Sequence, residues 1–235
     1  MTASLYRWPT AAAFGRVVPK TKFYEHATIS TALREKFVSE VQRITWAYKL
    51  AEETIRLRGD ASVPEIQVFA LDAKDDNVSD DVLIAIDKAV QTPIIFEVNR
   101  GTGDQARTRM IASHKTLSTG APRLSTYFAT DWLLTDSPRA PLPPALDLPG
   151  LYMQLLTPLL PIATRPGETM SEATKRMDQA HKLKREIASL EKRLRNEPQL
   201  NRQIELHRQL GDRTTALTAL TDPATPKTED APWKS

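Results

Sequence analysis

The stretch that decides the fold is residues 65–98, EIQVFALDAKDDNVSDDVLIAIDKAVQTPIIFEV. Its first part, residues 65–71, combines β-branched and aromatic residues, a composition typical of a strand. The middle part places apolar residues on one side of a helix over residues 79–90. Pro93 ends that helix, and the mostly apolar residues 94–98 predict a buried strand. A strand–helix–strand unit within one sheet favours a parallel pair of strands.

The sequence on both sides adds a helix and two more strands. Residues 31–50 predict one helix, because their apolar residues recur at three- and four-residue spacing. These residues are Leu33, Phe37, Val41, Ile44 and Tyr48. After a polar turn at residues 101–103, we expect residues 107–113 and 125–133 to add as antiparallel strands, whereas residues 1–29 predict an irregular lead-in. The expected fold is of the α/β (α+β) class, a small mixed β-sheet of about four strands backed by helices.

The second half of the chain has a different composition. Residues 138–150 contain five prolines and predict an extended connector after a domain formed by residues 1–137. We expect residues 151–221 to be helical and to include a coiled-coil hairpin. The proline-bearing residues 222–235 predict a disordered tail.

Two apolar stripes flank a break at Asn196-Glu197-Pro198 in the helical region. The first stripe follows the alternating spacing of a coiled-coil seam; it comprises Leu183, Ile187, Leu190 and Leu194. The second stripe comprises Leu200, Ile204, Leu210 and Leu217. Proline at the break requires either a kink or a hairpin, and a hairpin lets the two helices bury each other's stripe. The predicted partner-binding residues are Leu183, Ile187, Leu190, Leu194, Ile204 and Leu210.

Composition excludes several kinds of chemistry. The 235 residues include no cysteine, so a disulfide framework, a thiolate metal site and a cysteine nucleophile are all ruled out. Only eight residues are glycine, and neither GxGxxG nor GxxxxGK[ST] occurs. No apolar run is long enough to cross a membrane, and the start lacks the layout of a signal peptide. We therefore expect a soluble cytoplasmic protein.

Positive charge is concentrated in the helical region. The whole chain carries a formal charge of +3, whereas residues 172–213 alone hold eleven Lys or Arg and seven Asp or Glu. Such a face attracts phosphate groups by counterion release, which makes contact with DNA one prediction for this region. The predicted nucleic-acid-binding residues are Lys182, Lys184, Arg185, Lys192, Arg193 and Arg195. The alternatives are a solvated helix surface of mixed charge, or charges that flank a coiled-coil contact with another protein.

Five stretches of sequence resemble a bacterial family catalogued as domain of unknown function 4391. They are KTKFYEH at residues 20–26, ITWAYKL at 44–50, EIQVF at 65–69 with PIIFE at 93–97, and NRQIEL at 201–206. The resemblance covers about residues 4–218 in the same order. It implies partners that act on DNA, because members are found near helicases and DNA methyltransferases in restriction-like, anti-phage loci. It implies no catalytic residues.

Local motifs for catalysis are scarce. The four histidines are far apart in the sequence, and neither HExxH nor GxSxG occurs. One arrangement suits a divalent-metal-dependent nuclease, in which carboxylates from a helix and two strands hold Mg²⁺ beside a lysine. Its residues would be Glu40, Asp72, Lys74 and Glu97. Asn99 stands where this motif would have lysine, so we favour the alternative in which Asp72 and Lys74 are solvated turn residues and Glu97 pairs with a nearby base.

The leading hypothesis is a non-enzymatic accessory or adaptor subunit of a helicase or DNA methyltransferase complex, with no cofactor and no resident metal. The absence of a catalytic motif, together with a seam and a basic face in one appendage, motivates it. One alternative is the nuclease, which alone would require Mg²⁺. Another alternative is a structural protein that forms a homodimer through its C-terminal helices.

Overall fold

The computed structural model describes residues 4–25, 30–117 and 122–222. The chain divides into two compact units, Met1–Leu160 and Pro161–Ser235. Of the predicted tail, residues 222–235, only Asp222 lies within the described residues. Within the described parts of the chain, no helix has the length and apolar character needed to cross a membrane.

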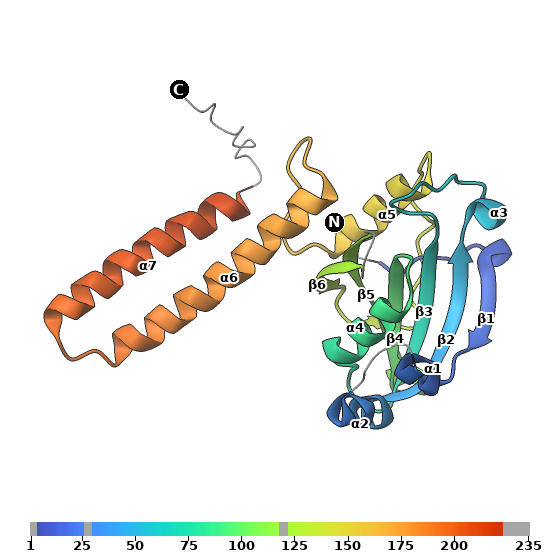
Figure 1. Ribbon diagram of the computed structural model, residues 1–235, viewed down its shortest axis with the longest axis horizontal. Helices are drawn as coiled ribbons and strands as arrows, with labels where there is room; N and C mark the ends of the chain where they lie inside the picture. Colours follow the sequence, from blue (N-terminus) through green and yellow to red (C-terminus); the bar gives the residue numbers. More distant parts are fainter. Residues whose placement is uncertain (1–3, 26–29, 118–121, 223–235) are drawn as a thin grey trace. The chain divides into compact units, whose positions relative to one another are not determined.

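The first unit is built on a seven-stranded mixed sheet (Figure 1). The strands are β1 (Ala13–Val17), β2 (Val41–Leu50), β3 (Ile66–Ala73), β4 (Ile94–Arg100), β5 (Arg107–Thr116), β6 (Arg123–Ala129) and β7 (Leu133–Leu134). The strands β1 to β6 lie side by side in sequence order, and β7 also pairs with β5. Only β3 and β4 run parallel among the described pairs. The predicted fold class is confirmed, but the sheet has more strands than the predicted four.

Helices precede and link the strands. They are α1 (Lys20–Glu25), α2 (Thr31–Glu40), α3 (Glu52–Ile55), α4 (Asp80–Ala89) and α5 (Leu148–Leu156), with short 3₁₀ turns at Thr10–Ala12, Gly103–Gln105 and Thr157–Leu159. Helix α4 forms the crossover between β3 and β4, as the sequence predicts. Its Val82 and Ile86 are fully buried in the core.

Residues 31–50 do not form the single helix that the sequence predicts. The helix α2 ends at Glu40, and β2 begins at the next residue. The pairing of β2 with β3 has irregularities between Val41 and Arg43 and between Trp46 and Tyr48. Each bulge adds one residue to β2, so its apolar side chains recur at three or four residues, which imitates a helix. The β-branched and aromatic residues of this segment, among them Thr45 and Trp46, have a high strand propensity, which favours a strand over a continued helix.

The predicted lead-in, residues 1–29, also contains regular structure. Strand β1 pairs with β2, and α1 follows it. All five residues of β1 are exposed. The strand therefore lacks the alternation of apolar and polar residues by which a half-buried strand is recognised.

Aromatic side chains run across one face of the sheet. Successive ring centroids in this row lie 4.4 to 6.5 Å apart. The row consists of Phe14, Trp46, Phe69, Phe96 and Tyr127. Side chains from α1, α2 and α4 join Phe69 and Phe96 in one core cluster. Because neighbours in a strand alternate, Glu97 points to the opposite face, where Trp8 and Arg139 contact it.

The second unit contains two long helices, α6 (Met170–Arg195) and α7 (Leu200–Thr221). Thr169 and Glu172 form a reciprocal capping box at the start of α6. The helix ends before Asn196, and α7 begins after Pro198 and packs back along α6 (Figure 1). The predicted C-terminal helical hairpin is therefore confirmed.

Candidate nucleic-acid interface

The basic residues predicted to bind DNA lie on the exposed part of α6. All six side chains are exposed: Lys182, Lys184, Arg185, Lys192, Arg193 and Arg195. None of them forms an ion pair or a side-chain hydrogen bond with the residues that the structure describes. Their charges are thus free to attract an external anion.

These six residues form three rows along α6. A helix repeats every 3.6 residues, so side chains seven or eleven residues apart lie on the same side. The rows are Lys182 with Arg193, Arg185 with Lys192, and Lys184 with Arg195. Arg185 and Lys192 each follow a seam leucine by two residues, about 200° around the helix, and therefore face away from the seam.

The charges of α7 are arranged differently. Arg208 contacts Glu205 at 2.8 Å and Asp212 at 3.6 Å on its own helix. Hydrogen bonds from Arg208 and Gln209 lower the pKa of Glu205 to about 2. Arg213 contacts Glu186 of α6 at 3.0 Å, across the helical pair. Two of the three arginines of α7, Arg208 and Arg213, are thus paired with carboxylates, in contrast to the three rows of α6.

The apolar seam agrees with the prediction on α6 and differs on α7. Leu190 is 9 % exposed, whereas Ile204 of α7 is 61 % exposed and does not belong to the seam. Leu206, which the sequence analysis passed over, is 5 % exposed and takes that place. Leu206 and Leu210 are four residues apart, the spacing of one helix face, whereas Ile204 is displaced from that face. Leu200 of the predicted second stripe is 69 % exposed as well, so it does not belong to the seam either. The remaining stripe residues are half-buried: Leu183, Ile187, Leu194, Leu210 and Leu217.

Arg176 lies on α6 as well, but it has a structural role. Its guanidinium donates to both carboxylate oxygens of Glu168, at 2.7 and 2.8 Å, and to the carbonyl oxygens of Ala163 and Leu220. Burial raises the pKa of Glu168, but hydrogen bonds from Arg176 and the Arg165 N–H outweigh this effect, so the pKa is lowered. Arg176 therefore fastens the segment before α6 to the last turn of α7.

The carboxylates of the predicted nuclease site have separate partners. Glu40 accepts a hydrogen bond from the Ser79 backbone N–H at 2.7 Å, at the start of α4. Asp72 contacts Arg43 at 2.7 Å, and it accepts a hydrogen bond from the Asn99 amide at 3.0 Å.

Glu97 is 7 % exposed, and its carboxylate accepts hydrogen bonds from Trp8 at 2.8 Å and from Arg139 at 2.6 Å. This contact matches the expected pairing of Glu97 with a nearby base. The Lys74 side chain is exposed. Across residues 4–25, 30–117 and 122–222, no three His, Cys, Asp or Glu side chains are grouped closely enough to hold a metal ion.

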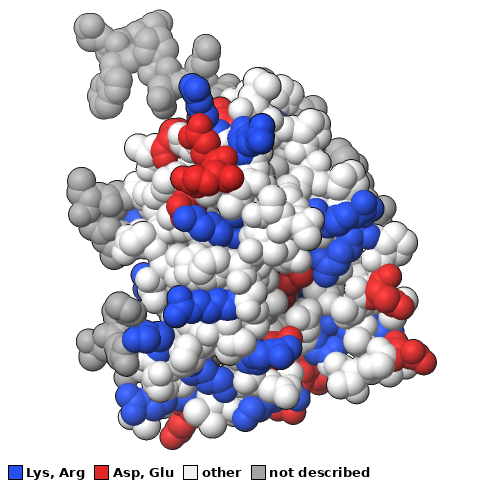
Figure 2. Space-filling model, turned by 90° about the vertical axis from the view of Figure 1, so that its right-hand side faces the viewer, with Lys and Arg blue, Asp and Glu red and all other residues white. Residues whose placement is uncertain are grey.

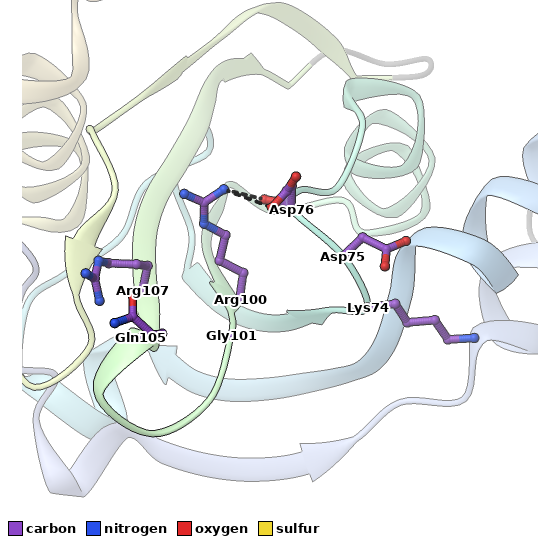
Figure 3. Close-up of a pocket in the computed structure, with 7 residues that line it drawn as sticks. All are labelled: Lys74, Asp75, Asp76, Arg100, Gly101, Gln105 and Arg107. Carbon is purple, nitrogen blue, oxygen red and sulfur yellow. Dashed lines mark hydrogen bonds and ion pairs between the residues drawn. The ribbon is translucent and has the colours of Figure 1, made fainter.

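A polar pocket of about 420 Å³ lies outside the carboxyl ends of β3 and β4 (Figure 3). It is lined by Lys74, Asp75, Asp76, Arg100, Gly101, Gln105 and Arg107. In Figure 3 the side chain of Arg100 reaches toward Asp76, while Lys74 and Arg107 lie on opposite sides of it. Of these lining residues, only Lys74 is a candidate site residue in the sequence. The signal that could have found the pocket was the polar residues directly after two neighbouring parallel strands, where open α/β sheets bind ligands.

Charged residues continue from this end of the sheet to its β1 side. Figure 2 faces that side, and its lower half shows Lys and Arg interspersed with Asp and Glu, where β1 ends and β2 begins. Lys20 and Lys74 belong to this end. Burial and the charge of Lys74 both lower the pKa of Lys20, because a second nearby cation disfavours its protonated form.

The described residues thus form a mixed α+β domain and a basic helical pair, and they contain no group of His, Cys, Asp and Glu side chains that could hold a metal ion. The chain belongs to the family described as Domain of unknown function (DUF4391), whose profile matches residues 7–216. No curated protein and no solved structure shows significant similarity to the chain.

Proposed function

We propose that the protein is a non-enzymatic accessory subunit of a bacterial anti-phage defence complex, and that it contacts DNA through α6. The observation that supports DNA contact is the set of six exposed cations on α6, none of which is paired within the described chain. The family resemblance supplies the class of partner, a helicase or DNA methyltransferase subunit.

The charge arrangement favours phosphate contact over base readout. Lys and Arg side chains on several sides of one helix can contact the phosphates of a duplex whatever its base sequence. Each such contact releases condensed counterions. The segment of α6 that carries the three rows, residues 182–195, has no aromatic residue to stack on a base. Binding is therefore expected to depend on salt and to show little sequence preference.

The experiment measures binding of a labelled DNA duplex by fluorescence anisotropy over a series of salt concentrations. Three double variants each reverse one row: Lys182→Glu with Arg193→Glu, Arg185→Glu with Lys192→Glu, and Lys184→Glu with Arg195→Glu. Reversal of the row that faces DNA should weaken binding most. In a plot of the logarithm of the association constant against the logarithm of the salt concentration, the slope should become less steep by about 0.9 for each phosphate that the variant no longer neutralises.

The matched control is Lys88→Glu with Arg123→Glu, which changes the charge equally at exposed positions of the first unit. It should bind DNA like the wild type. Equal binding by the wild type and all three row variants would refute DNA contact through α6. Cleavage of plasmid DNA by the wild type with Mg²⁺ or Mn²⁺ would refute the non-enzymatic role.

The proposed partner is tested by co-expression of the tagged chain with the helicase and methyltransferase genes of its own locus. Co-purification of either subunit at a fixed stoichiometry supports the accessory role. Elution of the chain alone, at the same column position as when it is expressed by itself, counts against it.

A further inference from the structure

We infer that the pocket at the carboxyl ends of β3 and β4 is a second nucleic-acid contact, which binds the sugar–phosphate backbone of a DNA strand. This inference rests on the proposed function and adds a site on the first unit. The pocket lies where open α/β sheets place their ligands, beyond the carboxyl ends of parallel strands. Its volume, about 420 Å³, falls within the range of ligand sites.

The two arginines of the pocket are held in place by only part of each guanidinium. The Arg100 Nη1 donates to the Asp76 carbonyl oxygen at 3.2 Å, and the Arg107 Nη1 donates to those of Asp104 and Ala106 at 3.1 and 3.2 Å. Within the described residues, the Nε and Nη2 groups of both arginines make no hydrogen bond. Guanidinium presents its donors as a planar fork that matches phosphate oxygens, so each arginine is fixed and still has free donors.

Further interactions position Arg100. Its guanidinium lies 4.2 Å from the ring centroid of Trp132, and Arg109 lies 4.7 Å from the same centroid. A cation over an aromatic face is attracted to it, which restricts the motion of the long side chain. The entropy lost when a phosphate binds is therefore reduced.

Gly101 gives the pocket its shape. Its φ of +69° lies in the left-handed region, and a Cβ atom there would approach the Gln105 carbonyl oxygen to 2.8 Å. The turn between β4 and β5 therefore packs its backbone against Gln105 only because residue 101 has no side chain. This close turn brings Gln105 and Arg107 to the same pocket as Arg100.

The lining favours a backbone over a free nucleotide. None of the seven lining residues has an apolar or aromatic side chain, so the pocket offers no surface for a base. The cations also do not converge, because Lys74 and Arg107 lie on opposite sides of Arg100 (Figure 3). Separated cations suit successive phosphates of a strand, whereas a single phosphate group would require convergent donors.

Three carboxylates near this end of the sheet have partners, whereas Asp75, a lining residue with an exposed side chain, forms no ion pair with the described residues. Asp72 pairs with Arg43, Asp81 pairs with Lys36, and Glu40 binds the Ser79 N–H. The Asp76 carboxylate is fully exposed and lies 3.6 Å from Arg100. Burial and the charge of Lys74 lower the pKa of Lys20, whose ammonium group donates to the Val41 carbonyl oxygen.

The test uses the full chain and the labelled duplex described above. The pocket variant is Lys74→Gln with Arg107→Gln. Its matched control is Lys88→Gln with Arg123→Gln, two exposed positions at the end of the sheet away from the pocket. Removal of two phosphate-binding cations should flatten the salt slope by about 1.8 and weaken binding at least tenfold near 0.1 M salt. The control should match the wild type in both quantities.

The outcome separates this site from α6. Unchanged affinity and slope in the pocket variant would overturn the pocket while leaving the α6 result to stand. Weaker binding by the pocket variant, with wild-type binding by the α6 variants, would support the pocket and refute the proposed interaction through α6. Arg107→Lys keeps the charge and should keep the slope; an equal flattening of the slope in Arg107→Lys and Arg107→Gln would indicate a disturbed turn and overturn the proposal.

Discussion

Gly101 and Gly103 both adopt positive φ angles in the turn between β4 and β5, +69° and +56°. Residues other than glycine pay a conformational cost in this region, because their Cβ atom crowds the following carbonyl group. The two positions differ in their surroundings. A Cβ atom on Gly101 would meet the Gln105 carbonyl oxygen, whereas one on Gly103 would meet nothing within 4 Å.

We therefore expect Gly101→Ala to destabilise the protein more than Gly103→Ala. The left-handed conformation alone should cost about 1–2 kcal/mol in each variant. Gly101→Ala should lose about 1 kcal/mol more because the backbone must shift. Urea unfolding monitored by circular dichroism measures both changes, and equal losses of stability in the two variants would contradict the packing argument.

Individual residues are predicted unevenly by the sequence. The pairing of Glu97 with a base is expected, but the base, Arg139, lies 42 residues away in the chain, and no local pattern identifies it. No sequence pattern points to Lys115. It lies in a strand, and only the tertiary fold brings it to the end of α4, where its ammonium group is fully buried.

Elements with a single clear periodicity are predicted well. The strands β3 and β4 and the helix α4 agree with the sequence analysis because their apolar residues follow one period from end to end. The helix predicted over residues 31–50 is wrong in its second half, because bulges change the period of β2. The two helices of the second unit are predicted by the spacing of their apolar residues and by Pro198. The predicted buried face of α7 is displaced, because Ile204 and Leu206 both fit a loosely spaced apolar pattern but only Leu206 is buried.

This corrected register predicts the effect of two substitutions in α7. Leu206→Ala should destabilise the helical pair by about 2–3 kcal/mol, because it removes a buried side chain and leaves a cavity. Ile204→Ala should change stability by less than about 0.5 kcal/mol, because that side chain is mostly exposed. Thermal unfolding followed by helical circular dichroism compares the two, and a larger effect of Ile204→Ala would argue for a seam that contains Ile204.

The whole molecule consists of two units with different electrostatics. The first unit buries an ion pair, in which the Lys115 Nζ lies 2.5 Å from Asp87 Oδ1. The second unit carries the excess of basic residues and is fastened by the pair of Glu168 and Arg176, whose side chains are both 5 % exposed. The sequence predicts the charge asymmetry, which needs only counting, but not the pocket, which forms from loops that follow different strands.

The pair of Glu168 and Arg176 makes stability depend on pH. The pKa of Glu168 is lower in the folded chain than its ordinary value, so its contribution is complete above about pH 4.5 and is lost as pH falls through the folded pKa. Glu168→Gln should lower the free energy of unfolding by about 1.5–3 kcal/mol at neutral pH. Between neutral and acid pH the variant should then lose less stability than the wild type, because it has no carboxylate to protonate at this position. Urea midpoints at about pH 6 and pH 3.5 measure this, with exposed Glu191→Gln as control. An unchanged acid sensitivity in Glu168→Gln would contradict the assignment.

The ammonium group of Lys115 donates to the carbonyl oxygens of Asp87, Val90 and Thr92, at 2.7 to 2.8 Å. A residue of β5 thus caps the helix that precedes β4, so the last turn of α4 is completed only when β5 has docked. We therefore expect this block to fold in a concerted way, because a nascent chain that stops before residue 115 lacks the ammonium group that satisfies these carbonyl oxygens. Amide protons in the final turn of α4 and in β5 are expected to exchange with solvent deuterium as one cooperative unit.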